Sequence, residues 1–362
     1  MVPVNTGAED GALALFGAVG DALAGRRLGF SRRRADAAAR FAQYRGANDE
    51  ATDASWIAGL LAEAGLLEVV LAPSATERQR LFALSDAPLH GAHVMASLDL
   101  PAHAADIVRW HREHDDGTGY PDRLRWDGIP ADAAALGIVH AACELVEDPV
   151  EPRPIAEALF AIVAESGRRF SVERVRAFRA FVAARGDSWD EPFVPALSRV
   201  DENAVLSLLA TRIDARDDRT LGRSERVALL AAGIAERLQI DAATAARLVR
   251  LHALGRATAS GDDEDFDPLS RFGRERRAAE AERAAALAAV APRYAADAPL
   301  LVASARWHEE GESDVQAATL ALALAVEALD AVEAPRRIAA AAGTQFDPHV
   351  ARTYLASLGA PT

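Results

Sequence analysis

The chain contains no lysine, because all 40 of its Lys-plus-Arg positions are arginine. No lysine side chain can therefore bind a phosphate as a point charge or form a Schiff base. Cysteine is nearly absent too, since Cys143 is the single cysteine among 362 residues. One cysteine excludes an intrachain disulfide and a zinc site built from cysteines.

Aromatic residues make up only 6% of the chain, whereas 50% of it is hydrophobic and dominated by Ala and Leu. Ala and Leu favour helices, and alternating strand patterns are scarce. Apolar residues recur three or four positions apart, most clearly in segments 31–43, 54–66, 224–238, 243–254 and 316–332. The sequence therefore predicts an all-α fold.

The formal net charge of -14 leaves no general basic face for nucleic acid. The first 25 residues lack a basic region before their apolar run, and acidic residues interrupt that run. This pattern is typical of neither a signal peptide nor a membrane helix. We expect a cytoplasmic protein that binds neither nucleic acid nor a membrane.

Four short segments recur along the chain in the same order. The pairs are GFSRRRA (29–35) with GRSERVA (222–228), GLLAEAG (59–65) with RLHALG (250–255), VRWHRE (108–113) with ARWHEE (305–310), and SGRRFSVERV (166–175) with AGTQFDPHV (342–350). Their offsets are 193, 190, 197 and 176 residues, so spacing drifts only by the length of a loop. We interpret this as two copies of one helical domain. They span 1–190 and 198–362, and the Gly/Pro/Asp-rich segment 185–195 marks the boundary.

One segment carries a recognisable signature. HREHDDGTGYPDRLRWDGIP at 111–130 resembles the signature of the HD-GYP family, whose usual form is HHE-x-x-DG-x-GYP followed by IP. In the second half, GRSERVA resembles the family's GHSERVA segment, and AGTQFDPHVARTYL at 342–355 resembles the end of such a domain. The first copy keeps the GYP loop, and the second lacks it.

The resemblance implies an all-helical fold and a metal-dependent phosphodiesterase that hydrolyses cyclic di-GMP or a related cyclic dinucleotide. It also implies iron or manganese held by His and Asp/Glu side chains. Such chemistry needs a metal-bound hydroxide as nucleophile and a second metal to hold the phosphoryl oxygens. Imidazole and carboxylate suit these cations.

Most ligand positions of the family are altered in the first copy. They fall at Phe30, Ala62, Glu63, Ala87, His111, Arg112, Glu113 and His140. Of the metal ligands only His111 is kept, although Glu63 and His140 have side chains able to coordinate. Arg112 replaces a neutral ligand with a permanent cation. If it pairs with Glu63 or Glu113, we expect the first site to be closed to metal.

The second copy is altered at other positions. The corresponding residues are Arg223, His252, Ala253, Arg256, His308, Glu309 and Glu327. His252 and His308 keep two histidines of the motifs, Arg223 stands at a histidine position, and Arg256 stands where active members carry a lysine. No residue between 270 and 295 can be assigned to the HPEIG-like segment from sequence.

Our leading hypothesis is a catalytically degenerate HD-GYP-like protein with a regulatory or scaffolding role. It would bind a cyclic dinucleotide without hydrolysing it, and it would need no cofactor. The residues that we assign to ligand binding are Arg109, Arg112, Glu113, Gly119, Tyr120, Arg223 and Arg256.

Two alternatives stay open. The first is an active phosphodiesterase with iron or manganese in a reduced site, for which the candidate ligands are Glu63, His111, His140, His252, His308 and Glu327. Glu113 would join such a site in the first copy, and Glu309 would be a fourth ligand in the second. The second alternative is a helical module for dimerisation or for binding a protein partner.

Overall fold

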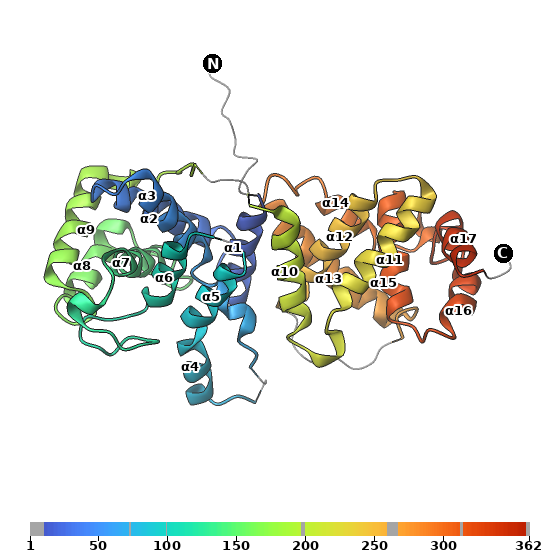
Figure 1. Cartoon of the computed structure of the whole chain (residues 1–362), viewed down its shortest axis with the longest axis horizontal. Helices are drawn as coiled ribbons and strands as arrows, with labels where there is room; N and C mark the ends of the chain where they lie inside the picture. The colour runs from blue at the N-terminus through green and yellow to red at the C-terminus, as the bar shows by residue number, and fades with distance from the viewer. Residues whose placement is uncertain are drawn as a thin grey trace, which may run out of the picture. The chain divides into compact units, whose positions relative to one another are not determined.

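The computed structural model describes residues 11–71, 74–98, 100–196, 200–258, 267–311 and 314–359. Within these ranges every regular element is a helix and no strand occurs, which confirms the all-α prediction (Figure 1). The chain forms two compact units, Met1–Val200 and Asp201–Thr362. Residues 1–10 lie outside the described residues, and so does most of the acid-rich segment 260–268, whose composition predicts a solvated loop.

The first unit packs its helices around a core that contains Phe16, Phe41 and Trp56. Its α-helices are α1 (Gly11–Leu23), α2 (Phe30–Tyr44), α3 (Asp49–Leu61), α4 (Glu77–Ser85), α5 (Ala87–Ala96), α6 (Ala102–Trp110), α7 (Ala131–Val146), α8 (Ile155–Ala164) and α9 (Val172–Arg185). Helix α2 contacts both α3 and α7, so residues from these three helices meet inside the unit.

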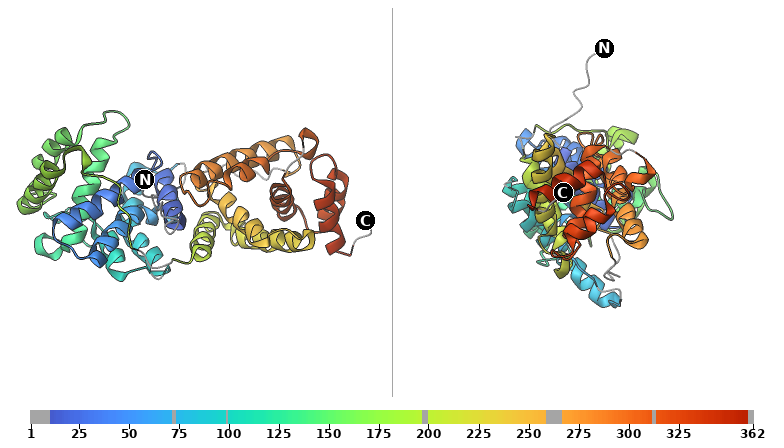
Figure 2. Two further views of the ribbon diagram at one scale, coloured as in Figure 1. Left: turned by 90° about the horizontal axis from the view of Figure 1, so that it is seen from above. Right: turned by 90° about the vertical axis from the view of Figure 1, so that its right-hand side faces the viewer.

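The second unit has its own core, in which Ile234, Leu322, Ile338 and Val350 are buried. Its α-helices are α10 (Glu202–Asp214), α11 (Arg223–Leu238), α12 (Ala242–Leu254), α13 (Arg271–Ala289), α14 (Ala298–Ala303), α15 (Val315–Glu327), α16 (Ala334–Ala341) and α17 (Pro348–Ser357). Helices α16 and α17 lie together at the C-terminal end of this unit (Figure 2).

Each unit has a buried aspartate whose carboxylate accepts hydrogen bonds from a serine at the start of a helix, α2 in the first unit and α11 in the second. Asp21 accepts hydrogen bonds from the Ser31 amide (2.9 Å) and hydroxyl (3.1 Å). Asp214 accepts them from the Ser224 amide (2.6 Å) and hydroxyl (2.8 Å). Both pairs are separated by an offset of 193 residues, which is the offset of the first repeated segment.

Most helix predictions match the structure within a residue or two, and two do not. The segment 54–66 is helical only to Leu61, and a 3-10 helix follows over Ala64–Glu68. The segment 316–332 ends as helix at Glu327, because the Asp330 carboxylate accepts the backbone N–H groups of Val332 (2.9 Å) and Glu333 (3.3 Å) and forms a turn.

Across the described ranges, no helix combines the length and the apolar character that crossing a bilayer requires.

Candidate functional site

Charged and polar side chains from four segments of the first unit converge between α2 and α7. We call this group the ionic cluster; its members are Arg26, Arg34, Glu63, Arg112, His140 and Glu144. Arg34 lies one turn after Phe30 on α2, and Glu144 lies one turn after His140 on α7. The side chains of Arg34 and His140 are fully buried, so the charges meet in a medium of low polarity.

Glu63 is the acceptor shared by two arginines. Its Oε1 lies 3.3 Å from Arg34 Nη1 and 3.3 Å from Arg112 Nη2. Burial alone would raise the pKa of Glu63, but Arg112 and the other neighbouring cations hold it at about 2. Arg34 also donates through Nε to the Gly59 carbonyl at 2.7 Å. The Glu63 carboxylate is therefore ionised and paired at neutral pH.

His140 is a neutral member of the cluster. Burial lowers its pKa to about 4, and Arg112 and Arg34 act in the same direction. Arg112 Nη2 lies 2.8 Å from His140 Nε2. Because a guanidinium can only donate, Nε2 accepts from Arg112, and Arg34 Nη1 faces the other ring nitrogen, Nδ1, at the longer distance of 3.4 Å. The lone pair that would bind a metal is thus used by Arg112.

Glu144 completes the pairing. Its Oε1 lies 2.6 Å from Arg26 Nη2 and 3.5 Å from Arg112 Nη2. Burial opposes ionisation of Glu144, but His140, Arg112 and Arg26 hold its pKa well below the usual range. With His140 neutral, three guanidinium groups face two carboxylates, so the cluster carries one net positive charge.

These residues do not fit the metal centre that the family resemblance implies. Phe30, Ala62 and Ala87 provide no ligand atom, and the two candidates Glu63 and His140 both contact arginine. Among the described residues, no three His, Cys, Asp or Glu side chains form a group able to hold a metal ion. A permanent cation 2.8–3.3 Å from both candidate ligands would also repel a divalent cation.

His111 lies next to the cluster without joining its hydrogen bonds. Its ring stacks on His140 with centroids 5.4 Å apart, and Nδ1 donates to the Val108 carbonyl at 2.7 Å. Burial and the nearby Arg112 lower the pKa of His111 well below its usual value. Its Nε2 is buried and has no hydrogen-bond partner in the described structure. The structure does not bring His111, Glu113 and His140 together as a metal-binding group.

The ligand-binding residues predicted in the GYP loop make contacts that hold the loop itself. Glu113 accepts the backbone N–H groups of Asp122 (2.6 Å) and Leu124 (2.9 Å), not a hydrogen bond from Arg112. Arg109 pairs with the Asp122 carboxylate through two nitrogens, at 2.8 and 3.1 Å. These contacts explain the loop's shape without a ligand.

Gly119 and Tyr120 join the loop to the end of α6 through the backbone. A Cβ on Gly119 would lie 2.3 Å from the His114 nitrogen and 2.5 Å from the Glu113 Cα, so only glycine fits. The Tyr120 N–H donates to the Arg112 carbonyl at 3.2 Å. The loop therefore packs directly against the segment that carries Arg112.

The second unit has a small pocket of about 10 Å³ between its helices. Its lining includes Arg223, His252, Arg256, Glu280 and Leu324. His252 is 2% exposed, and its Nε2 is buried with no partner in the described structure. Burial lowers the pKa of His252 to about 4, so the imidazole is neutral at pH 7.

Both arginines predicted to bind an anion in this unit pair with acids of the protein. Arg256 donates to Asp214, and its Nη2 lies 3.1 Å from the Ser224 hydroxyl. Arg223 Nε lies 2.8 Å from Glu327. Glu327 therefore neutralises arginine, and it forms no metal-binding group with His252 and His308 in the described residues.

Glu280 is a pocket residue that sequence reasoning missed. A Cβ on Gly65 would lie 1.8 Å from the Ala87 carbonyl oxygen, and a Cβ on Gly255 would lie 1.9 Å from that of Glu280. Gly65 and Gly255 end the second pair of repeated segments, so Glu280 corresponds to Ala87. Ala87 stands at the position of the HPEIG-like histidine, which could not be assigned in the second unit from sequence. No motif surrounds Glu280, so only this packing reveals the match.

Hydrogen bonds also change which residue of the second unit corresponds to His111. The Ser304 hydroxyl, at the end of α14, donates to the Leu301 carbonyl at 2.7 Å, as His111 at the end of α6 donates to Val108. The His308 N–H bonds to the Gln345 carbonyl at 3.2 Å. The same contact in the first unit is made by Asp115 and Arg169, also at 3.2 Å. Ser304, and not His308, therefore corresponds to His111.

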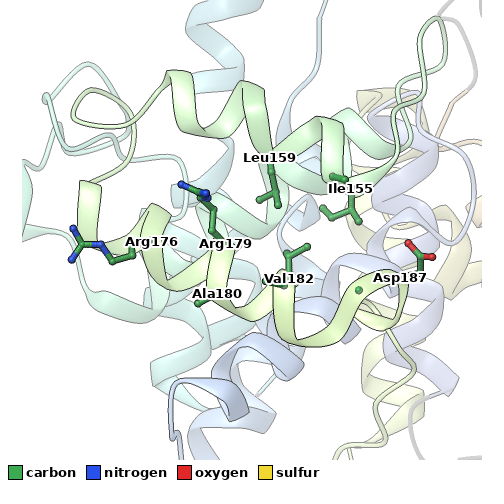
Figure 3. A pocket seen from close by; sticks show the side chains of 10 residues that line it. Ile155, Leu159, Arg176, Arg179, Ala180, Val182 and Asp187 are labelled. Carbon is green, nitrogen blue, oxygen red and sulfur yellow. The ribbon is translucent and has the colours of Figure 1, made fainter.

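The first unit also has an apolar cavity that shares no residue with the ionic cluster. It has a volume of about 630 Å³ and lies between α8 and α9. Ile155 and Leu159 on α8 face Val182 on α9, and Arg176 and Arg179 border the cavity (Figure 3).

A protein-family model matches most of the first unit. Residues 22–173, which contain the ionic cluster and the GYP loop, match the family described as HD domain. This match supports the coarser part of the sequence-based assignment, a likeness to HD domains, over that segment.

A solved structure resembles the whole chain. The cyclic GMP-AMP-specific phosphodiesterase V-cGAP3 of V. cholerae superposes with a TM-score of 0.70 at 16% sequence identity, over 98% of each chain. At this identity the likeness shows a shared fold. No curated protein matches the sequence.

Proposed function

We propose that this protein is a catalytically degenerate HD-GYP-like protein, built from two tandem copies of the domain. It acts in regulation or as a scaffold and binds a cyclic dinucleotide without hydrolysing it. The single observation that carries the proposal is the Arg112 guanidinium, which contacts both Glu63 and His140 at the place of a metal ligand.

The loss of catalysis follows from the donor atoms. A phosphodiesterase of this type needs imidazole nitrogens and carboxylate oxygens that are available to a metal. In the first unit the Glu63 and His140 donors bind arginine, and in the second unit Arg223 and Arg256 border the pocket. Neither pocket retains enough available donors to activate a water molecule.

The tandem arrangement is supported by contacts that recur in both units. The Asp–Ser contact appears as Asp21–Ser31 and Asp214–Ser224. Near the end of each unit, a glycine N–H bonds to the carbonyl three residues later, from Gly167 at 2.7 Å and from Gly343 at 2.8 Å. Loops of different length between these contacts account for the change of offset.

A cyclic dinucleotide is the proposed ligand because the V. cholerae protein with the same fold is described as a cyclic GMP-AMP-specific phosphodiesterase. Such a ligand carries two phosphodiester charges, and the ionic cluster has an excess of one positive charge. Arginine recognises phosphate oxygens through two parallel N–H groups, which suits a lysine-free protein.

The test is to purify the full chain, measure its iron and manganese content, and assay cyclic di-GMP and cyclic GMP-AMP with added manganese. We expect substoichiometric metal, no turnover, and micromolar binding of a cyclic dinucleotide by calorimetry. Stoichiometric metal together with turnover would show that the protein is an enzyme and would refute the proposal.

An interaction module is the second candidate, and one observation favours it. Phe160 and Val163, one turn apart on α8, are 77% and 38% exposed, so this helix presents neighbouring apolar side chains to solvent. If neither cyclic dinucleotide binds, we expect Phe160→Ser to weaken self-association, measured by analytical ultracentrifugation.

A further inference from the structure

A second cavity in the first unit lies outside the expected metal position. It has a volume of about 830 Å³ and opens between the α1–α2 loop and the segment that follows α7. Ligand pockets in proteins commonly have volumes of about 300–1,000 Å³. The cavity is therefore large enough for a nucleotide-sized molecule.

The cavity wall combines cations with apolar surface. Arg26, Arg27 and Arg33 line it, and Leu28 and Pro149 provide apolar contact area. A wall that combines apolar contact area with placed charges is typical of sites for small anionic ligands.

Two acids, Glu147 and Asp148, also line the cavity, but they do not pair with all of these arginines. Glu147 pairs with Arg33 at 2.6 Å, and Asp190 pairs with Arg33 at 2.9 Å. Asp148 uses Oδ1 to accept the backbone N–H groups of Val150 and Glu151, both at 2.9 Å. Arg33 is thus paired, and the Asp148 carboxylate is engaged in its own turn.

Arg26 and Arg27 have N–H donors that are available to a ligand. In the described part of the chain no acidic side chain pairs with Arg27. Arg26 directs Nη2 to Glu144 at 2.6 Å, but its Nε is buried and has no hydrogen-bond partner in the described structure. A buried N–H without an acceptor is destabilising, so a ligand oxygen placed there would remove that cost.

The second unit lacks an equivalent arrangement. Residues 193 positions after Arg26 and Arg27 are Arg219 and Thr220. Arg219 pairs with Asp217 at 3.0 Å, and the Thr220 hydroxyl donates to the Asp214 carbonyl at 2.7 Å. In the second unit, the side chains at the positions that correspond to Arg26 and Arg27 thus form hydrogen bonds within the protein.

We propose that this cavity is the binding site for a phosphodiester anion, with Arg27 and the Arg26 Nε–H donating to its phosphate oxygens. The ligand class, a cyclic dinucleotide, rests on the proposed function, whereas the place of binding rests on the cavity and its arginines. Arg26 also contacts Glu144, so the site is joined to the ionic cluster through one side chain.

The test compares the full chain with two variants by titration calorimetry. Arg27→Ala removes an exposed cavity cation, and Arg176→Ala removes a cation that borders the α8–α9 cavity instead. The probes are cyclic GMP-AMP, cyclic di-GMP and inorganic pyrophosphate. We expect Arg27→Ala to weaken binding about tenfold to a hundredfold, the usual effect of losing a charge-assisted hydrogen bond, and Arg176→Ala to leave it unchanged.

The outcomes separate the cavity from the proposed function. If a cyclic dinucleotide binds equally to the wild type and to Arg27→Ala, the cavity is the wrong site, although the proposed function stands. If only pyrophosphate binds, and binding depends on Arg27, the cavity is an anion site and the cyclic dinucleotide class is wrong. If the wild type binds none of the probes, the inference is overturned.

Discussion

The two units share several contacts but pair their buried charges differently. Each has a buried Asp–Ser contact at the start of its second helix. In the first unit Arg34 and Arg112 point at Glu63 and His140, so opposite charges neutralise one another inside the pocket. In the second unit the arginines pair with acids such as Asp214 and Glu327, and the buried Nε2 of His252 has no hydrogen-bond partner in the described residues.

The two units therefore bury charge in different ways. In the first unit, Glu63 stays ionised because Arg34 and Arg112 both pair with it. In the second unit, Arg256 and Arg223 pair with Asp214 and Glu327. The buried histidine is neutral in both units, and both arrangements give the buried charges partners of opposite sign.

The largest expected effect comes from removing the carboxylate at the centre of the first cluster. Glu63→Gln leaves the fully buried Arg34 without the carboxylate it contacts, which should lower the free energy of unfolding by about 4 kcal/mol. Urea unfolding measures the loss. The exposed Glu236→Gln on α11 serves as a control and should cost less than about 0.5 kcal/mol. Equal effects for the two variants would contradict a stabilising cluster.

Acidification tests the neutral histidines that both units share. The folded-state pKa of His140 and of His252 is about 4, below the usual 6.5, so the folded state binds fewer protons. Stability is therefore complete above pH 6.5 and declines as pH falls toward 4. Between pH 7 and 5 each ring should remove about 2 kcal/mol of unfolding free energy.

Asp21 opposes this trend, because burial raises its pKa to about 6 and the folded state gains a proton there. Its contribution over the same interval is about 1 kcal/mol of stabilisation, which offsets part of the loss that the buried histidines cause. Urea unfolding at pH 7 and 5 measures it, and His252→Gln should reduce the pH dependence by about 2 kcal/mol. The exposed His349→Gln should not, and an equal reduction by both would argue against this account.

The glycine contacts test whether the frame is equivalent in the two units. Gly65→Ala and Gly255→Ala each place a methyl group less than 2 Å from a carbonyl oxygen. The backbone must shift, and we expect each variant to lose about 2 kcal/mol of unfolding free energy. Gly128→Ala, where the added Cβ meets nothing within 4 Å, is the control in thermal unfolding. Loss in only one unit would break the equivalence.

The smallest expected effect concerns matched helix caps. Asn48 accepts the Ala51 N–H at 2.9 Å at the start of α3, and Asp241 accepts the Ala243 N–H at 3.1 Å at the start of α12. Replacing either cap with alanine should cost about 1 kcal/mol in urea unfolding. A cost in one unit alone would mean that the two helices depend on their caps to different degrees.

The sequence predicted the helices well and the cluster in part. Glu63, Arg112 and His140 were already assigned to ligand positions by resemblance. Arg34 and Glu144 were missed, yet each lies four residues from such a position on the same helix, which places it on the same face. That spacing was the available signal, but only the packed structure shows which neighbours contact the pocket.

The second unit was harder to predict because its loops differ in length. The Trp-His pair suggested that His308 matches His111, but the backbone hydrogen bonds shift the match by four residues to Ser304. Glu280 has no neighbouring motif, and only the contact with Gly255 identifies its place. Short local similarity cannot fix register where a loop has been lost, whereas tertiary contacts can.

The GYP loop has a consequence for how such chains are classified. Its shape depends on Glu113 holding two backbone N–H groups, on the Asp115–Arg174 ion pair, and on a glycine at 119 that no other residue can replace. Selection for folding alone can therefore preserve this sequence motif. A survey that reads this motif alone would record a loop, whereas residues such as Glu63 and His140, whose donors a metal would need, lie outside the motif.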